Sequence, residues 1–483
     1  MCDDVAVPDR LSPLDASFLY LEDARSAMHV GSVMVFALPE AGLDLQRIVD
    51  LVAARIDAVP RYRQRVREMP AGLSAPVWID DAAFDVSYHV RRSALPRPGS
   101  DDQLEEFVGR IQGRPLDRRH PLWELYVVEG LCDDRFAIVT KTHQALVDGI
   151  NALDLGHLLL DESPEGEPQP TVDRVSRREP GDLELIVRTV FELATSPRRM
   201  ASTARRGVGD IAKVAGRVGH AAGGLAGTLL RTAASPAPTS PLNVVTGASR
   251  RVRLVQADLK DFRAVREAMP TPAGGVQLDI TINDVVLAVV AGALALWLAG
   301  RGEPVHSGST VRALVPISVA DGGQAVGLVS GLHAAVVDLP VGETNPRVRL
   351  EGIAYQMRRQ ARPGQAVGAA SIAGLAGFAP PTLHHLGARM GSAMSRRFFN
   401  LVILNAPGPQ QPLYASGARM LAGYPVIPLA AGQALSIGLT SYDGSMCIGL
   451  NADRGAMPDL DVLGDCLIEA LRELLAQVEG GSQ

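Results

Sequence analysis

Hydrophobic and polar positions over the first 160 residues alternate between patterns typical of strands and patterns typical of helices. Residues 45–56 follow a helical period, and a second helical pattern places Ile150, Leu153 and His157 on one face. Three segments rich in β-branched and apolar residues predict strands: 29–36, 122–128 and 135–142. This part of the chain is therefore expected to fold as a mixed α/β unit.

The chain from residue 243 to its end shows the same alternation. Thr281, followed three residues later by Asp284, resembles a capping box at the start of a helix, and an apolar run over 285–300 comes next. Because a membrane-spanning helix needs about 20 apolar residues, this shorter run predicts a buried core helix. Two strands and a closing amphipathic helix are predicted further along: 311–319, 331–339 and 461–478.

The segment between these units has a different composition. Residues 162–180 carry four prolines among charged residues, which is typical of a linker, and residues 185–231 form an interrupted, basic helical pattern. Such a stretch binds an anionic membrane surface in some proteins and packs as a solvated helix in others, and the sequence leaves both open. The predicted domains are residues 1–160, 161–242 and 243–483, with the middle one as the connector.

Composition disfavours several classes of protein. The chain is 47% hydrophobic and 21% charged, which is typical of globular proteins, and its net charge of −6 offers no basic field to hold nucleic acid. The four cysteines form no CxxC pair, and His384-His385 has no partner at ligand spacing, so neither a disulfide framework nor a metal site is predicted. The N-terminus has no apolar leader, and a cytoplasmic location is expected.

Side chains of types that can take part in catalysis or binding gather at residues 141–149, which read Lys-Thr-His-Gln-Ala-Leu-Val-Asp-Gly. His143 follows a predicted strand, Asp148 is placed to cap the next helix, and Gly149 would permit a tight turn. Junctions of this kind often carry binding and catalytic residues. Considered alone, however, the spacing of His143 and Asp148 favours a structural histidine.

These residues resemble the His-His-x-x-x-Asp-Gly motif of the bacterial wax ester synthase/diacylglycerol acyltransferase family. Further blocks that look like the family's follow in the same order along nearly the whole chain. They are Leu11-Ser12-Pro13-Leu14-Asp15, Met28-His29-Val30-Gly31, Arg114-Pro115-Leu116-Asp117, Pro121-Leu122-Trp123-Glu124, Asn283-Asp284-Val285-Val286-Leu287-Ala288, Asn405-Ala406-Pro407-Gly408-Pro409, Tyr424-Pro425-Val426 and Gly432-Gln433-Ala434-Leu435. Each block alone is weak evidence, but their joint order is specific.

The resemblance implies an α/β fold with two chloramphenicol-acetyltransferase-like domains of the CoA-dependent acyltransferase superfamily, joined by a long helical connector. The implied reaction transfers an acyl group from acyl-CoA, a co-substrate, to diacylglycerol or a long-chain alcohol, giving triacylglycerol or wax ester without a further cofactor. The site would lie between the two halves at a tunnel. Because these acceptors are lipids, peripheral contact with the inner face of the membrane or with lipid inclusions is also expected.

The same resemblance assigns roles to individual residues. In this family the second histidine of the motif deprotonates the acceptor hydroxyl, and the aspartate, here Asp148, is mainly structural. Gly149 completes the motif. Two further blocks are expected to contribute to the substrate pocket: Pro121, Leu122 and Trp123 in one, and Asn283 and Asp284 in the other. Helix capping is an alternative role for Asn283 and Asp284.

Gln144 stands where the family has its base. A glutamine amide has no nitrogen basic enough to take a proton near neutral pH, although it can orient a hydroxyl. General base catalysis contributes roughly 10²–10⁴-fold, so its loss predicts a slowed enzyme in which positioning still operates. His143 either substitutes as the base or is a buried, hydrogen-bonded histidine, since neighbouring side chains on an extended segment point to opposite faces.

Two further positions depart from the family. Ala320 ends a predicted strand where many members have arginine, and Gly327-Leu328 stands where Gly-Asn is usual. Two hypotheses follow: a slowed acyl-CoA-dependent O-acyltransferase, or a non-catalytic paralogue that binds acyl-CoA or lipid. A third, a peptide-synthetase condensation domain, shares the motif but is disfavoured by the other blocks. No G-x-S-x-G elbow, Walker loop or dinucleotide fingerprint occurs, which disfavours those chemistries.

Overall fold

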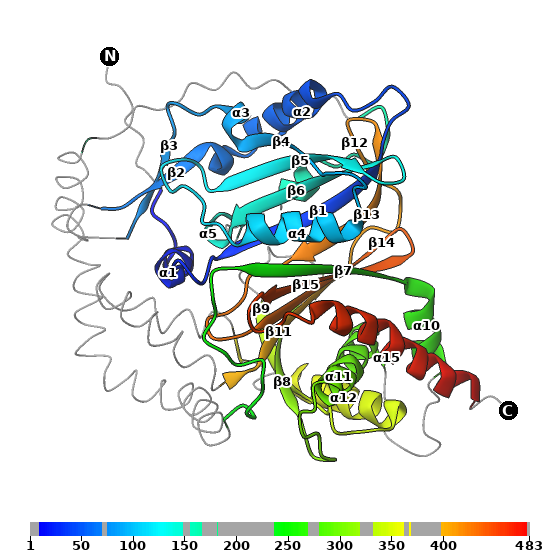
Figure 1. Ribbon diagram of the computed structural model, residues 1–483. Coiled ribbons are helices and arrows are strands. Elements are labelled where there is room, and N and C mark those ends of the chain that lie inside the picture. Colours follow the sequence, from blue (N-terminus) through cyan, green and yellow to red (C-terminus); the bar gives the residue numbers. More distant parts are fainter. Residues whose placement is uncertain are drawn as a thin grey trace, which may run out of the picture.

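The computed structural model describes residues 9–69, 75–147, 155–166, 181, 236–268, 280–318, 332–361, 367–368 and 398–480. Within these ranges the chain forms two α/β bodies, each built on one large sheet. Figure 1 shows the first body, mostly blue to cyan, above the second, mostly green to red. The two predicted α/β units are confirmed, whereas most of the predicted connector, 161–242, lies outside the described residues.

Six strands form the first sheet in the described chain, in the order β12-β13-β1-β6-β5-β4. The predicted strands 29–36, 122–128 and 135–142 correspond to three of them. Their bounds are His29–Ala37 (β1), Val90–Ala94 (β4), Trp123–Leu131 (β5), Arg135–His143 (β6), Tyr414–Ala415 (β12) and Ala418–Val426 (β13). The other elements of this body are α1 (Pro13–Leu21), α2 (Leu45–Asp57), η1 (Pro60–Arg63), β2 (Gln64–Arg67), β3 (Val77–Asp80), α3 (Val86–His89), α4 (Asp101–Gln112), α5 (Gln144–Val147) and α6 (Leu155–Leu158).

The second sheet has seven strands among the residues described, in the order β10-β9-β8-β11-β14-β15-β7. Their bounds are Arg250–Asp258 (β7), Val311–Ser318 (β8), Leu332–Leu339 (β9), Val367–Gly368 (β10), Leu401–Ala406 (β11), Leu435–Tyr442 (β14) and Ser445–Asp453 (β15). Its helices lie together on one side of the sheet in Figure 1: α10 (Leu259–Glu267), α11 (Ile282–Gly300), α12 (Pro346–Ala361) and α15 (Leu460–Gly480).

Helix α11 is the core helix that the apolar run predicted. It begins with a capping box, in which the Thr281 side chain accepts the backbone amide of Asp284 and the Asp284 carboxylate accepts the backbone amide of Thr281. Thirteen of its 19 residues are buried, and it packs against α12 and α15. Its length and composition would also suit a membrane span, but its burial in this body is that of a core helix.

The first sheet is completed by strands from the far end of the chain. Strand β13 pairs with β1 in an antiparallel ladder that runs from Gly31 opposite Val426 to Phe36 opposite Met420. Residues 414–426 belong to the predicted domain 243–483, so part of that domain completes the sheet of the first body, which the predicted limits did not include. Those limits otherwise stay a prediction.

The exchanged strand crosses the second sheet at a pair of glycines. Gly438 of β14 and Gly449 of β15 face each other in register. A side chain on Gly449 would place its Cβ 2.1 Å from the carbonyl oxygen of Pro425, and one on Gly438 would lie 2.9 Å from the same oxygen. Only residues without a Cβ therefore let β13 pass this close to β14 and β15.

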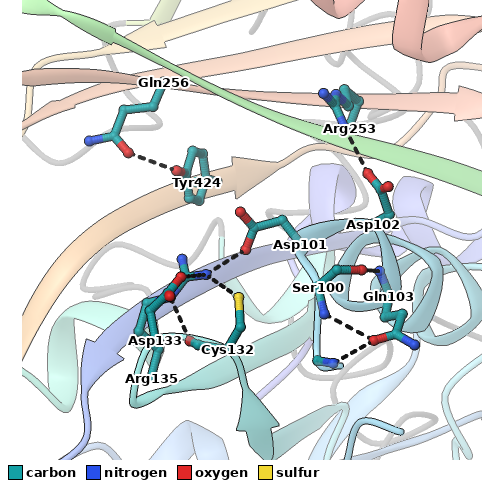
Figure 2. A network of polar contacts seen from close by, with 11 residues as sticks. Ser100, Asp101, Asp102, Gln103, Cys132, Asp133, Arg135, Arg253, Gln256 and Tyr424 are labelled. Atoms are coloured by element: carbon teal, nitrogen blue, oxygen red, sulfur yellow. Dashed lines mark hydrogen bonds and ion pairs between the residues drawn. The ribbon is translucent and has the colours of Figure 1, made fainter. Parts of the chain in front are cut away.

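Helix α4 is a second connection between the two bodies, because it packs on β1 of the first sheet and on β7 of the second. Figure 2 shows the polar contacts around its N-terminus. The Arg253 guanidinium of β7 lies 3.1 Å from Asp102 and 3.2 Å from Glu105, both on α4. On the other side, Arg135 at the start of β6 donates to Asp101 over 3.1 Å. The N-terminal turn of α4 thus ties both bodies together.

Candidate active site

The junction between β6 and α5 carries the residues that sequence analysis singled out. His143 is the last residue of β6 and Gln144 the first of α5. The backbone amide of His143 donates to the carbonyl oxygen of Leu122 over 2.9 Å, and that of Gln144 donates to Met28 over 2.8 Å. His143 also lies opposite His29 in the ladder between β1 and β6. Two of the family-like blocks therefore hold the motif from either side.

His143 is completely buried, and both of its ring nitrogens face protein groups. The backbone amide of Ala145 donates to Nδ1 over 3.0 Å. Because an amide can only donate, Nδ1 is an acceptor here and the neutral ring carries its proton on Nε2. That nitrogen lies 3.5 Å from Oε2 of Glu22. This arrangement is the buried, hydrogen-bonded one of the two alternatives.

Glu22 is the feature of this site that sequence analysis did not find. It is the C-cap residue of α1, and its nearly buried carboxylate meets four groups. Oε1 accepts the backbone amide of Met28 over 3.3 Å and lies 2.9 Å from Nε2 of His29. Oε2 accepts a hydrogen bond of 2.9 Å from Arg118 and faces His143. One acidic residue in a single sequence carries no signal that would identify such a cluster.

The charges of this cluster follow from its surroundings. Burial raises the pKa of Glu22, but contacts with His143 and His29 outweigh it and hold that pKa well below its usual range. Burial lowers the pKa of His29 to about 4, with Glu22 opposing the shift. Near neutral pH the cluster therefore consists of an ionised carboxylate, a neutral His29 and the Arg118 guanidinium.

Gln144 differs from its neighbour in that its side chain is partly exposed. Within the part of the chain that the structure describes, its amide makes no side-chain hydrogen bond. A partly exposed amide can accept or donate a hydrogen bond to a bound molecule. Asp148 and Gly149, which complete the motif, lie outside the described residues.

The Pro121-Leu122-Trp123 block forms part of the core beside the motif. Leu122 and Trp123 are fully buried, and the Trp123 indole donates to the carbonyl oxygen of Tyr62 over 2.8 Å. The His89 ring stacks on Trp123 with ring centroids 4.4 Å apart, and burial lowers the pKa of His89 to about 4. In this structure the block packs the β5–β6 core and, through the Leu122 carbonyl, holds His143.

The Asn283-Asp284 block lies in the second body. Asp284 forms the capping box of α11, so the capping role considered from sequence is confirmed for this residue. Asn283 makes a different contact, in which the Asn405 side chain donates to its Oδ1 over 3.2 Å. Asn405 is the penultimate residue of β11 and begins another family-like block, so the fold brings these two blocks together. Whether either residue contacts substrate stays a prediction.

Several other expectations fall on parts of the chain that are not described. Ala320, Gly327 and Leu328 lie outside the described residues, as does the His384-His385 pair. Among the residues that the structure does describe, no group of three His, Cys, Asp or Glu side chains could hold a metal ion.

A small cavity of about 150 Å³ lies between α4 and β4–β5, lined by Phe107, Arg110 and Tyr126 among others. The predicted tunnel between the bodies stays a prediction.

Comparisons with known proteins identify the class. The sequence matches the "Wax ester synthase/diacylglycerol acyltransferase catalytic domain" over residues 11–286 and the family's C-terminal domain over 332–475. A Mycobacterium tuberculosis protein named "Probable diacyglycerol O-acyltransferase tgs1" is 32% identical over 97% of this chain and 96% of its own. Another from that species, named "Probable diacyglycerol O-acyltransferase tgs3", is 41% identical over 53% of this chain and 95% of its own.

Solved structures agree. The wax ester synthase/diacylglycerol acyltransferase from Marinobacter aquaeolei VT8 superposes with a TM-score of 0.67 at 29% identity, covering 98% of this chain and all of that one. A starter condensation domain of rhizomide synthetase shares the fold, with a TM-score of 0.55 at 12% identity, covering 98% of this chain and 94% of that one. The fold and the matched relatives thus define the class of the chain as an acyltransferase. The chain belongs to the wax ester synthase/diacylglycerol acyltransferase family.

Proposed function

We propose that this chain transfers an acyl group from acyl-CoA to the hydroxyl group of diacylglycerol or a long-chain alcohol, giving triacylglycerol or wax ester slowly. Family membership and the names of the relatives support the reaction. The slowness rests on one observation: the partly exposed side chain at the β6–α5 junction is the Gln144 amide. The residue beside it, His143, is enclosed by protein groups.

The proposed step requires only the two substrates. The acceptor oxygen attacks the thioester carbonyl carbon, the carbon–sulfur bond breaks, and CoA leaves as a thiolate. The proton of the hydroxyl ends on that thiolate, directly or through water. The Gln144 amide oxygen can accept a hydrogen bond from the hydroxyl and orient it, but the amide cannot take the proton in the way an imidazole does.

His143 does not replace the missing base in this proposal. A general base must reach the proton that it abstracts, directly or through one water. The His143 ring is completely buried, its Nδ1 accepts the Ala145 amide, and its Nε2 faces Glu22. Freeing this ring would break the Ala145 contact and uncover the Glu22 carboxylate, which has a free-energy cost.

A non-catalytic role is the second candidate, because Gln144 favours it as well. The chain would then bind acyl-CoA or lipid without turnover. In either case acyl-CoA and an acceptor lipid are the proposed ligands, with no metal and no separate cofactor. We further propose a cytoplasmic protein that reaches its lipid substrates at the inner face of the membrane or at lipid inclusions.

The test uses purified full-length chain with radiolabelled oleoyl-CoA and either dioleoylglycerol or hexadecanol in mixed micelles. Labelled triacylglycerol or wax ester on thin-layer plates, above a heat-denatured control, supports the enzyme. Saturable binding of oleoyl-CoA with no product above that control supports the non-catalytic candidate. Neither binding nor product would overturn both.

A further inference from the structure

The Glu22 carboxylate contacts two chain segments beside residue 144: the Met28–His29 segment and the end of β6 at His143. We propose that Glu22 is a positioning residue of this acyltransferase, which fixes His143 and the Met28–His29 segment and so aims the side chain at position 144. This inference rests on the proposed function. It goes beyond the motif, because Glu22 lies more than 100 residues away on the cap of another helix.

The geometry connects the carboxylate to Gln144 along two short routes. On one route, the Met28 amide donates to Glu22 over 3.3 Å, and the Met28 carbonyl accepts the amide of Gln144 over 2.8 Å. On the other route, Oε2 of Glu22 faces Nε2 of His143, whose Nδ1 accepts the amide of Ala145. The residues on both sides of the open amide are therefore held by groups that Glu22 contacts.

Arg118 binds the Glu22 carboxylate on the side that faces solvent. Arg118 donates to Glu22 over 2.9 Å and to the carbonyl oxygen of Leu19 at the end of α1 over 2.8 Å. Its side chain is 39% exposed, whereas that of Glu22 is 7% exposed. Arg118 thus closes the outer side of the cluster and supplies the charge that a nearly buried anion requires.

Packing alone does not call for an anion here. An apolar side chain of similar volume would fill the space between α1, β1 and β6 without the cost of removing a charge from water. A carboxylate has two oxygens, so Glu22 can accept the Met28 amide and the Arg118 guanidinium while it faces two imidazoles at 2.9 and 3.5 Å. The structure uses this capacity at the point where residue 144 is set.

The first experiment replaces Glu22 with its uncharged isostere in two backgrounds, the wild type and Gln144→His. Glu22→Gln should lower kcat roughly 10- to 100-fold in the more active background, the size of effect that a misplaced reacting group produces. KM for oleoyl-CoA should change less than about threefold, because the residue does not touch substrate. The matched control is Glu267→Gln, an exposed glutamate at the end of α10 that pairs with its neighbour Arg266.

A second readout does not need turnover, so the inference can fail separately from the proposed function. Hydrogen exchange of a peptide covering residues 143–147 reports the amides of Gln144 and Ala145. These amides should exchange roughly tenfold faster or more in Glu22→Gln, because the groups that they bond lose their anchor. Exchange in β14–β15 should not change, and Glu267→Gln should leave both regions as they are.

The outcomes separate the two claims. Faster exchange with no turnover in any background would support Glu22 as the anchor while rejecting the proposed reaction. Unchanged exchange, or an unchanged kcat in a folded Glu22→Gln protein of an active background, would overturn the inference. Should Glu22→Gln not fold, Arg118→Lys is the milder variant, because Lys keeps the charge but is shorter than the guanidinium whose one nitrogen donates to both Leu19 and Glu22. Like Glu22→Gln, it should speed the exchange of these amides and lower kcat. No change in either quantity would again overturn the inference.

Discussion

The end of β6 and the helix α11 are both deeply buried, but they are built from opposite kinds of residue. Lys141, Thr142 and His143 are at most 1% exposed and all polar, whereas the buried residues of α11 are apolar except for Asp284 at its cap. The polar strand end needs partners from other elements for each side chain, while α11 needs only matching apolar surfaces. The first region thus depends on polar contacts and the second on apolar packing.

Lys141 illustrates the cost of the polar region. Its ammonium group donates to the carbonyl oxygen of Arg114 over 2.5 Å and lies 3.8 Å from Glu124. Burial lowers its pKa to about 8, with Glu124 opposing the shift. A buried ion pair of this kind contributes little net stability, since removing both charges from water offsets most of their attraction. Changes in the two regions should therefore separate folding from activity.

The largest effect on stability is expected in α11. Leu294→Ala removes a fully buried side chain and leaves a cavity, which should lower the free energy of unfolding by about 2–5 kcal/mol. The rate of acyl transfer per folded molecule should not change. Denaturant titration measures the first quantity, and Val348→Ala on the exposed side of α12 should change it by less than about 0.5 kcal/mol. A comparable loss in both variants would contradict the assignment of α11 to the core.

The next effect concerns the crossing of β13 over the second sheet. Gly449→Ala would place its Cβ against the carbonyl oxygen of Pro425, and overpacking of this kind should lower stability by about 3 kcal/mol. Gly352→Ala is the control, because no atom lies within 4 Å of its added Cβ and alanine favours the helix α12. It should raise stability by about 0.5–1 kcal/mol. Equal melting temperatures for the two variants would show that the crossing is not close.

A third effect is a dependence of stability on pH, which arises at His89, a residue that stacks on Trp123 beside the polar strand end. Burial lowers the pKa of His89 to about 4, below its ordinary value near 6.5, so unfolding takes up a proton between these values. The contribution of His89 is present above about pH 6.5 and is lost as the pH falls towards 4. Over pH 7 to 5 the loss is about 2 kcal/mol.

His89→Phe keeps a ring against Trp123 but removes the titrating group. The variant should lose less stability than the wild type on acidification from pH 7 to 5, by about 2 kcal/mol, in paired denaturant titrations. It should be less stable than the wild type at pH 7, because the contact of Nδ1 with the Trp123 carbonyl is lost. An equal loss on acidification in both proteins would show that His89 is not buried in its neutral form.

The smallest effect tests the cap of α11. Thr281→Ala removes the side chain that accepts the Asp284 amide, and loss of an N-cap costs about 1 kcal/mol. The Asn283–Asn405 contact should survive, so KM and kcat should change less than about twofold. A much larger loss of kcat would instead indicate that this helix start shapes the active site.

The sequence predicted what depends on local pattern. Strand β1 was expected over 29–36 and runs to Ala37, and the capping box at Thr281 was recognised from spacing alone. The pairing of β13 with β1 could not be predicted, because alternation shows that a segment is a strand but not which distant strand it joins. In the candidate site, the place of Gln144 directly after a strand followed from the predicted strand 135–142. The role of Glu22 did not, since it depends on how the end of α1 meets two strands.

The central claim is that position 144 is the open position of the site and holds an amide where a base would act. The most direct measurement is kcat for labelled oleoyl-CoA and dioleoylglycerol in wild type, Gln144→His and the non-basic control Gln144→Asn. We expect Gln144→His to raise kcat at least roughly tenfold and at most about 10⁴-fold, which is the upper end of what general base catalysis contributes. The variant should also acquire a pH dependence near an imidazole pKa. Gln144→Asn should show no such rise. A Gln144→His protein that folds like the wild type but is no faster than it, at any pH from 6 to 9, would contradict the claim.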